Sequence, residues 1–160
     1  MSRRPAWLVI ALALLGVLAA ACGGTSAPTP LSQAQAGQDY LDDIAPVHTT
    51  AATFATDVTT WNLTTTNAEA AADAAPLIAA EQSFDAGLAS TPWPATATSA
   101  IQTLIAQNKV IIADLEELST ITRAAVPAWE IKIDEDTVTD ATDSNMVRSD
   151  LGLPQATLSA

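Results

Sequence analysis

The stretch that decides the fold is residues 40–61, YLDDIAPVHTTAATFATDVTTW. Its apolar side chains return at alternating spacings of four and three residues, at Tyr40, Ile44, Val47, Ala51, Phe54, Val58 and Trp61. Because an α-helix turns once in about 3.6 residues, side chains at these spacings lie along one face. The pattern therefore predicts a helix that packs along this apolar seam. Pro46 interrupts it and either kinks the helix or moves its start to about residue 45.

Two similar patterns follow, and short turns separate them. The second seam is Ala70, Ala74, Leu77, Glu81, Phe84 and Leu88, and the third is Trp93, Ala97, Ile101, Leu104, Asn108, Ile111, Leu115 and Leu118. NLTTTN (62–67) and STPWP (90–94) are the predicted turns. Thr66 or Asn67 is expected to cap the second helix, and Pro94 suits the first position of the third.

A fourth helix is predicted from about Pro127 to Leu151. Trp129, Ile133 and Val147 indicate its inner face, but the intervening DEDTVTDATD (134–143) is poor in apolar residues. We interpret that acidic stretch as a solvated face. At the end, LGLP (151–154) places a glycine, an apolar residue and a proline in the order of a Schellman stop signal.

These four segments predict one all-α domain, an up-down-up-down antiparallel four-helix bundle over residues 39–154. We expect residues 155–160 to form a disordered tail. The only cysteine in the chain is Cys22. A single cysteine makes no internal disulfide, so packing alone must hold the fold together.

The beginning of the chain has the pattern of an export signal. Arg3 and Arg4 precede an apolar run at 6–21, which ends in LAAAC at Cys22. This order predicts a signal peptide over residues 1–21. The LAAAC stretch resembles a bacterial lipobox, although leucine lies four residues before the cysteine instead of the usual three. The resemblance implies a palmitate-type lipid anchor on Cys22 at the extracytoplasmic face of the cell membrane; the alternative is ordinary cleavage that leaves a free thiol.

Residues after the predicted signal peptide carry a strongly acidic charge. Residues 22–160 hold all 18 acidic residues and four of the six basic ones, for a net charge of −14. Binding to nucleic acid depends on lysine and arginine at the phosphates, so this balance argues against a nucleic-acid partner. Residues 22–38, rich in Gly, Pro, Ser and Gln, are expected to form a flexible tether.

Three short stretches carry a family resemblance. They are AAPLIAAEQSFDAGL (74–88), STPWP (90–94) and NMVRSDLGLP (145–154). They resemble a group of alanine-rich actinobacterial lipoproteins with a lipobox, a tether and a four-helix domain. Glu81 departs from the related pattern, which tends to have an apolar residue there, and the acidic fourth segment is a second departure. The resemblance implies a location and a fold, and it implies no catalytic residues.

Residues suited to metal binding or catalysis are scarce. His48 is the only histidine, and the Glu-x-x-His motifs of di-iron bundles are absent from the sequence. The acidic stretch lacks the glycine and terminal glutamate spacing of an EF-hand. Acyl transfer by serine or threonine needs a paired base and an oxyanion loop, for which no pattern is seen. We therefore expect no enzymatic activity, no metal and no cofactor.

Three polar residues on or beside the seams are candidates for ligand or buried polar contacts: His48, Glu81 and Asn108. In an antiparallel hairpin centred near residue 64, His48 and Glu81 lie opposite each other. We hypothesise that they form a partly buried hydrogen-bonded pair, with solvent exposure of both as the alternative. Asn108 either fixes the register of the helices or contacts a ligand.

The predicted function is that of a lipid-anchored binding or interaction module in the cell envelope. Its partner is an envelope protein or a small apolar ligand held between helices, and a structural or stress-related role is the alternative. An apolar cavity around Asn108 would favour the ligand, and a broad exposed apolar patch would favour a protein partner. A tightly packed bundle with neither would favour the structural role.

We predict that the native protein begins at Cys22 and carries acyl chains, because each buried CH₂ contributes about 0.8 kcal/mol to membrane binding. Mass spectrometry of material from the native bacterium should find the lipid adduct, and Cys22→Ala should lack it. An intact, unprocessed N-terminus would contradict the anchor.

Overall fold

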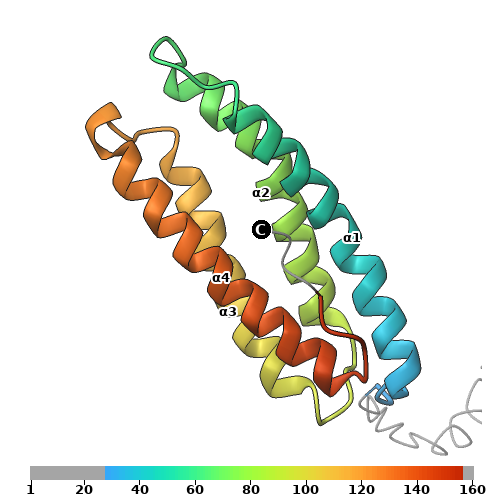
Figure 1. Ribbon diagram of the computed structural model, residues 1–160. Helices are drawn as coiled ribbons and strands as arrows, with labels where there is room; N and C mark the ends of the chain where they lie inside the picture. Colours follow the sequence, from blue (N-terminus) through green and yellow to red (C-terminus); the bar gives the residue numbers. More distant parts are fainter. Residues whose placement is uncertain (1–27, 157–160) are drawn as a thin grey trace, which may run out of the picture.

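The computed structural model describes residues 28–156. Within them the chain forms four α-helices and no strand: α1 (Gln33–Val58), α2 (Asn67–Ser90), α3 (Thr98–Glu117) and α4 (Val126–Asp150), with a short 3₁₀ helix, η1 (Arg123–Ala125), before α4 (Figure 1). The all-α prediction is confirmed. The predicted signal peptide, Cys22 and residues 157–160 lie outside the described residues.

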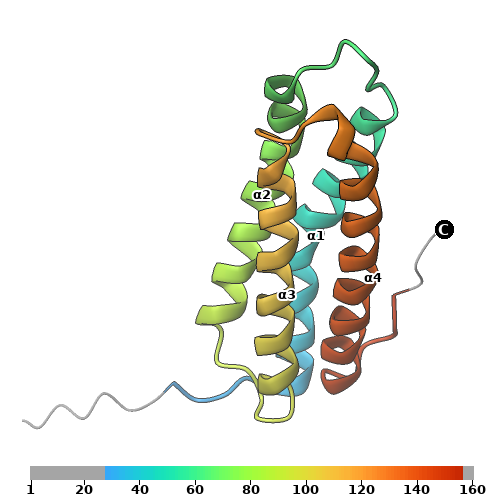
Figure 2. The same cartoon turned by 90° about the vertical axis from the view of Figure 1, so that its left-hand side faces the viewer.

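Consecutive helices pack side by side. The extended interfaces join α1 to α2, α2 to α3 and α3 to α4, whereas α1 and α4 share no interface of similar extent. The α1–α2 and α3–α4 connections lie at one end of the molecule, and the α2–α3 connection lies at the other (Figures 1 and 2). None of the helices in residues 28–156 has both the length and the apolar character that crossing a bilayer requires.

The core follows the predicted seams. Every residue of the second and third seams is buried, including Glu81 and Asn108. In the first seam, Tyr40, Ile44 and Val47 are buried, but the part from Ala51 onward is only half-buried. The apolar surface removed from water by these seams is the main favourable contribution to folding.

Side-chain capping fixes the starts of two helices. Ser32 and Gln35 form a capping box at α1, and Thr66 and Glu69 form another at α2. At α2, Thr66 N donates to Glu69 Oε2 at 2.8 Å, and Glu69 N donates to Thr66 Oγ1 at 3.2 Å. Such boxes satisfy N–H groups that have no partner inside the helix. Of the two predicted caps for α2, Thr66 is the one used.

Two predicted boundaries, the starts of α1 and α3, are wrong, and the structure excludes one of the two alternatives for Pro46. Helix α1 begins at Gln33, so the last residues of the predicted tether are helical, and Ala36 and Gly37 are buried. The helix also continues through Pro46, which excludes a start near residue 45. Helix α3 begins at Thr98 and not at Pro94, because Pro94 first forms a turn closed by Ala97 N donating to Pro94 O at 2.9 Å.

The predicted stop signal at the end of α4 is confirmed as a Schellman motif. Gly152 has φ of +70°, Leu153 N donates to Arg148 O at 2.8 Å, and Gly152 N donates to Ser149 O at 3.0 Å. The motif turns Leu153 back onto α1, where a Cβ added at Gly37 would lie 3.1 Å from Leu153 Cδ2. The following residues run back along α4, and Ala156 N donates to Asn145 Oδ1 at 2.8 Å. The first two residues of the expected tail, 155 and 156, are therefore described.

Replacing Gly152 with alanine should destabilise the fold. A side chain at this positive φ costs roughly 1–2 kcal/mol, because its Cβ meets the following carbonyl oxygen. We expect Gly152→Ala to lower the free energy of unfolding in urea by about that amount. Equal stability of Gly152→Ala and the natural chain would contradict the role of the motif.

Candidate functional site

A cleft of about 430 Å³ lies where α1 and α4 leave the domain open, and all four helices line it. Its walls are mostly apolar. The apolar lining residues are Ile44, Val47, Ala51, Leu77, Phe84, Leu104, Ile111, Ala141 and Ala156. The space exists because α4 presents small and polar side chains toward it, among them Thr137, Asp140 and Ser144. Of these, Ser144 reaches α1 through its hydrogen bond to Tyr40.

Two carboxyl groups in this cleft lack protein partners. Glu81 is only 7 % exposed, and none of its atoms takes part in a hydrogen bond or ion pair with the described residues. Asp140 has a buried Oδ1 atom with no hydrogen-bond partner in the same part of the chain. Buried polar groups in proteins are almost always hydrogen-bonded, so the enclosed Oδ1 of Asp140 needs an explanation. Glu81 lines the same cleft and also has no protein partner among the described residues.

Burial shifts the protonation of these groups. Removal from water, with Asp140 and Asp85 adding repulsion, raises the pKa of Glu81 to about 8. Removal from water, with repulsion from Asp143 and Asp85, raises the pKa of Asp140 to about 7. Both groups therefore exchange protons near neutral pH. A cation that enters the cleft would favour their charged forms.

A hydrogen bond closes the cleft at the end nearer the start of α1. The Tyr40 hydroxyl and the Ser144 hydroxyl lie 2.7 Å apart, and both residues are buried. The Tyr40 ring also meets Phe84 edge-on, with 5.8 Å between ring centroids. Burial is the main cause that raises the pKa of Tyr40 to about 12, so it stays a neutral hydroxyl at physiological pH. This contact ties α1 to α4 where the wider interface is missing.

The structure brings the three residues predicted from the sequence to this one cleft. His48, Glu81 and Asn108 all line it, but His48 is exposed. No hydrogen bond or ion pair between His48 and Glu81 is found in the described residues, so the predicted hydrogen-bonded pair is not formed. Asn108, 1 % exposed, donates from Nδ2 to Asp85 Oδ1 at 2.9 Å and so links α3 to α2. A hydrogen bond between two helices is what we expect of a residue that fixes the register of those helices.

The interpretation of residues 134–143 as a solvated acidic face is wrong in part. Asp143 is buried, and Asp140 has a fully buried carboxyl oxygen. Sequence reasoning missed Asp140, although a signal was present. Continuing the spacing of four and three residues from Ile133 leads through Thr137 to Asp140, Ser144, Val147 and Leu151. Polar residues occupy half of that seam, so an apolar search does not find it.

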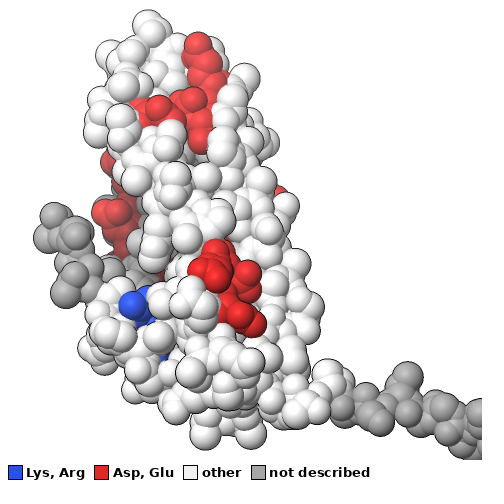
Figure 3. Space-filling view, turned by 90° about the vertical axis from the view of Figure 1, so that its right-hand side faces the viewer, with Lys and Arg blue, Asp and Glu red and all other residues white. Residues whose placement is uncertain are grey.

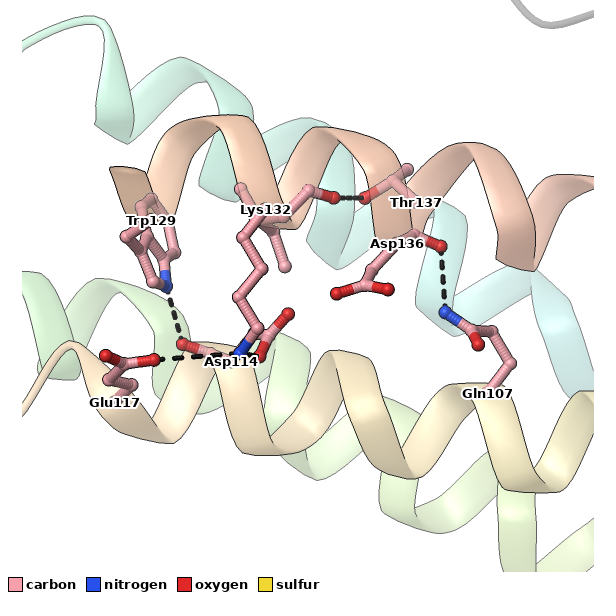
Figure 4. A network of polar contacts seen from close by, with 8 residues as sticks. Gln107, Asp114, Glu117, Trp129, Lys132, Asp136 and Thr137 are labelled. Atoms are coloured by element: carbon pink, nitrogen blue, oxygen red, sulfur yellow. Dashed lines mark hydrogen bonds and ion pairs between the residues drawn. The ribbon is translucent and has the colours of Figure 1, made fainter. Parts of the chain in front are cut away.

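Another buried carboxyl group, Asp114, lies between α3 and α4 outside the cleft, and its Oδ1 atom has a partner while its Oδ2 atom has none (Figure 4). Asp114, 1 % exposed, is ion-paired with Lys132, and its backbone oxygen accepts a hydrogen bond from Trp129 Nε1 at 2.7 Å. Further along the interface, Gln107 Nε2 donates to Asp136 O at 3.0 Å. These contacts hold α3 against α4, and we assign them a structural role.

Charge on the outside of the domain is mostly negative. On the face drawn in Figure 3, acidic side chains form separate groups and much less basic surface is seen. Among residues 28–156, no group of three or more His, Cys, Asp and Glu side chains is placed to hold a metal ion. Comparisons with protein-family models, with curated proteins and with solved structures find no match to this chain.

Replacing Glu81 with glutamine should change how stability depends on pH. Because the folded state keeps this proton up to about pH 8 and the unfolded chain releases it near pH 4.5, the free energy of unfolding should fall as pH rises between these values. Glutamine has no such proton. We expect Glu81→Gln to be more stable than the natural chain by about 1 kcal/mol or more at pH 9, with little difference at pH 4.

Urea unfolding followed by circular dichroism at both pH values measures this difference. Glu116→Gln, which removes an exposed carboxylate from α3, is the matched control and should keep the natural pH dependence. Parallel pH profiles for the natural chain and Glu81→Gln would contradict the burial of an unpaired carboxyl group.

Proposed function

We propose that this protein is a lipid-anchored extracytoplasmic protein that binds a small, largely apolar ligand in the cleft between α1 and α4. The observation that carries the proposal is the cleft itself, which lies around Asn108 and is lined by apolar side chains from four helices. We propose that the protein binds its ligand without a chemical reaction, since the residues that line the cleft offer only enclosure and a few polar contacts.

The size and composition of the cleft suit a small molecule. Its volume of about 430 Å³ falls within the range of roughly 300–1,000 Å³ that is common for ligand sites. Such sites combine apolar walls with a small number of polar groups that fix orientation. Here the walls come from residues such as Phe84 and Leu104, and the polar groups are Glu81, Asp140 and Asn108.

The exposed apolar residues favour a ligand over a broad protein interface. The large ones among the described residues are few: Leu63 in the α1–α2 connection, Val110 in α3, and Ile131, Val138 and Met146 in α4. A protein-binding surface is expected to gather such residues into one continuous patch. The open cleft also argues against a purely structural role, for which a fully packed domain would suffice.

The anchor and the helix order complete the proposal. LAAAC at Cys22 supports a lipid anchor on the outer side of the cell membrane. We further propose the up-down-up-down order, which is supported by the placement of the α1–α2 and α3–α4 connections at the end opposite the α2–α3 connection (Figure 2). In this order the chain leading from Cys22 enters the domain beside the α2–α3 connection, where Leu31 N donates to Pro92 O at 2.9 Å.

A neutral apolar probe tests the ligand site. We expect 1-adamantanol to bind the full chain in lipid nanodiscs at one site per chain, as measured by isothermal titration calorimetry against empty nanodiscs. Ala51→Phe places a ring in the cleft and should weaken this binding by about tenfold or more, because one lost contact of roughly 1.4 kcal/mol has that effect. Ala52→Phe changes the neighbouring exposed residue of α1 and should bind normally. Equal binding by the two variants, or none by the natural chain, would contradict the proposal.

A further inference from the structure

We propose that the cleft selects an organic cation, a compact apolar body that carries one amine or ammonium group, and that Glu81 and Asp140 hold its positive charge. This inference rests on the proposed ligand-binding function and adds the chemical class of the ligand. It follows from the two carboxyl groups without protein partners, from the charges around them and from the apolar walls.

The unpartnered carboxyl groups are the first step. Glu81 is 7 % exposed and lines the cleft, and Asp140 from α4 lines it as well. Asp114 provides a comparison within the same domain, because one oxygen of that buried carboxylate is paired with Lys132, although its Oδ2 is buried without a hydrogen-bond partner. A buried carboxylate is costly unless it is paired or hydrogen-bonded. A ligand that brings a positive charge and N–H donors would supply the partner that the protein omits.

Acidic groups outnumber basic ones around the two carboxyl groups of the cleft. Helix α3 contributes Lys109, which is exposed and acts on Asp85, a carboxylate that Asn108 already contacts. No basic side chain of the described residues forms an ion pair with Glu81 or Asp140. The titratable and charged groups around the two carboxyls are His48 and Tyr40 on α1, Glu81 and Asp85 on α2, Lys109 on α3, and Asp140, Asp143 and, beside Tyr40, Arg148 on α4.

The apolar walls distinguish an organic cation from a metal ion. Calcium takes six to eight oxygen ligands, and magnesium requires a nearly complete octahedron. The described residues offer no group of three or more metal-binding side chains at one point. An ammonium group is satisfied by two carboxylates, and its carbon body gains from contact with side chains such as Phe84 and Leu104. The lining therefore matches a cation that is mostly hydrocarbon.

Protonation gives the inference a pH signature. The pKa values of about 8 for Glu81 and about 7 for Asp140 mean that the ligand-free cleft is partly protonated near pH 7. A cation binds the ionised carboxylates more tightly than the neutral acids, so its affinity should rise as pH increases from 6 to 9. A quaternary ammonium has no proton to lose, which makes its pH dependence a direct measure of the protein groups.

The test compares probes that share one apolar body and differ in charge. Calorimetry on the full chain in nanodiscs would use 1-adamantylammonium, 1-adamantanol and 1-adamantanecarboxylate at pH 7.5. We expect the ammonium to bind about tenfold or more tightly than the alcohol, because its charge is attracted to the carboxyl groups in a poorly hydrated site. We expect the carboxylate to bind weakest, because the same groups repel it. The trimethylammonium analogue should bind more tightly at pH 9 than at pH 6.

Variants assign the effect to the two carboxyl groups. Glu81→Gln and Asp140→Asn should each weaken binding of the ammonium by about tenfold and leave the alcohol unchanged. They keep the side-chain shape and remove repulsion, and circular dichroism would verify that they fold. Asp134→Asn removes an exposed carboxylate from α4 and should bind as the natural chain does. This control separates contact in the cleft from a general loss of negative charge.

The possible outcomes separate this inference from the function on which it rests. Binding of all three probes with equal strength, or strongest binding of the alcohol, would overturn the cation inference and leave the ligand site intact. Loss of ammonium affinity in Asp134→Asn as large as that in Glu81→Gln would also overturn it. Failure of every probe to bind would overturn the ligand site and the cation inference together.

Discussion

The side of α4 that faces α1 is made of small and polar residues, and this shortage of apolar volume determines where the domain is open. Apolar seams close α1 on α2, α2 on α3 and α3 on α4, because each helix there offers a large side chain to the next. On the fourth side, Thr137, Ala141 and Ser144 face the cleft. The space of about 430 Å³ lies at this interface, where these small and polar side chains take the place of large apolar ones.

The open side is held at one end by a few specific contacts. Tyr40 meets Ser144 across the helices, Leu153 packs on Gly37, and Gln33 Nε2 donates to Asp150 O at 3.1 Å. All of these lie near the start of α1 and the end of α4. The glycine at position 152 makes this possible, because its positive φ turns the chain back toward α1. The domain thus keeps α1 and α4 together at one end while the middle of their shared side stays open.

Two buried carboxylates of the same chain show how context decides a role. Asp114 lies between α3 and α4 with Lys132 as its partner, and there it holds two helices together. Glu81 is buried to a similar degree but has no partner among the described residues, and the space beside it is a cleft. We assign Asp114 a structural role because it is paired, and we assign Glu81 a candidate binding role because it has no partner. Burial alone does not make that distinction, since both carboxyl groups have a raised pKa.

The sequence by itself determined the all-α class, the inner faces of α1, α2 and α3 and the stop at Gly152, because these follow from residue spacing and local backbone chemistry. It narrowed the cap of α2 to Thr66 or Asn67, and the structure showed that Thr66 is used. The sequence also drew attention to His48, Glu81 and Asn108. The start of α1 at Gln33 was missed although the sequence carries a local signal for it, the Ser32–Gln35 capping box; only the tertiary structure showed that Ala36 and Gly37 are buried and that Leu153 lies close to Gly37. It also placed Asp140 beside Glu81, because two polar positions far apart in the chain form one site only when packing brings their helices to the same cleft. The local sequence of an acidic helix face does not show whether that face is buried or exposed. Its burial depends on whether another helix packs against it.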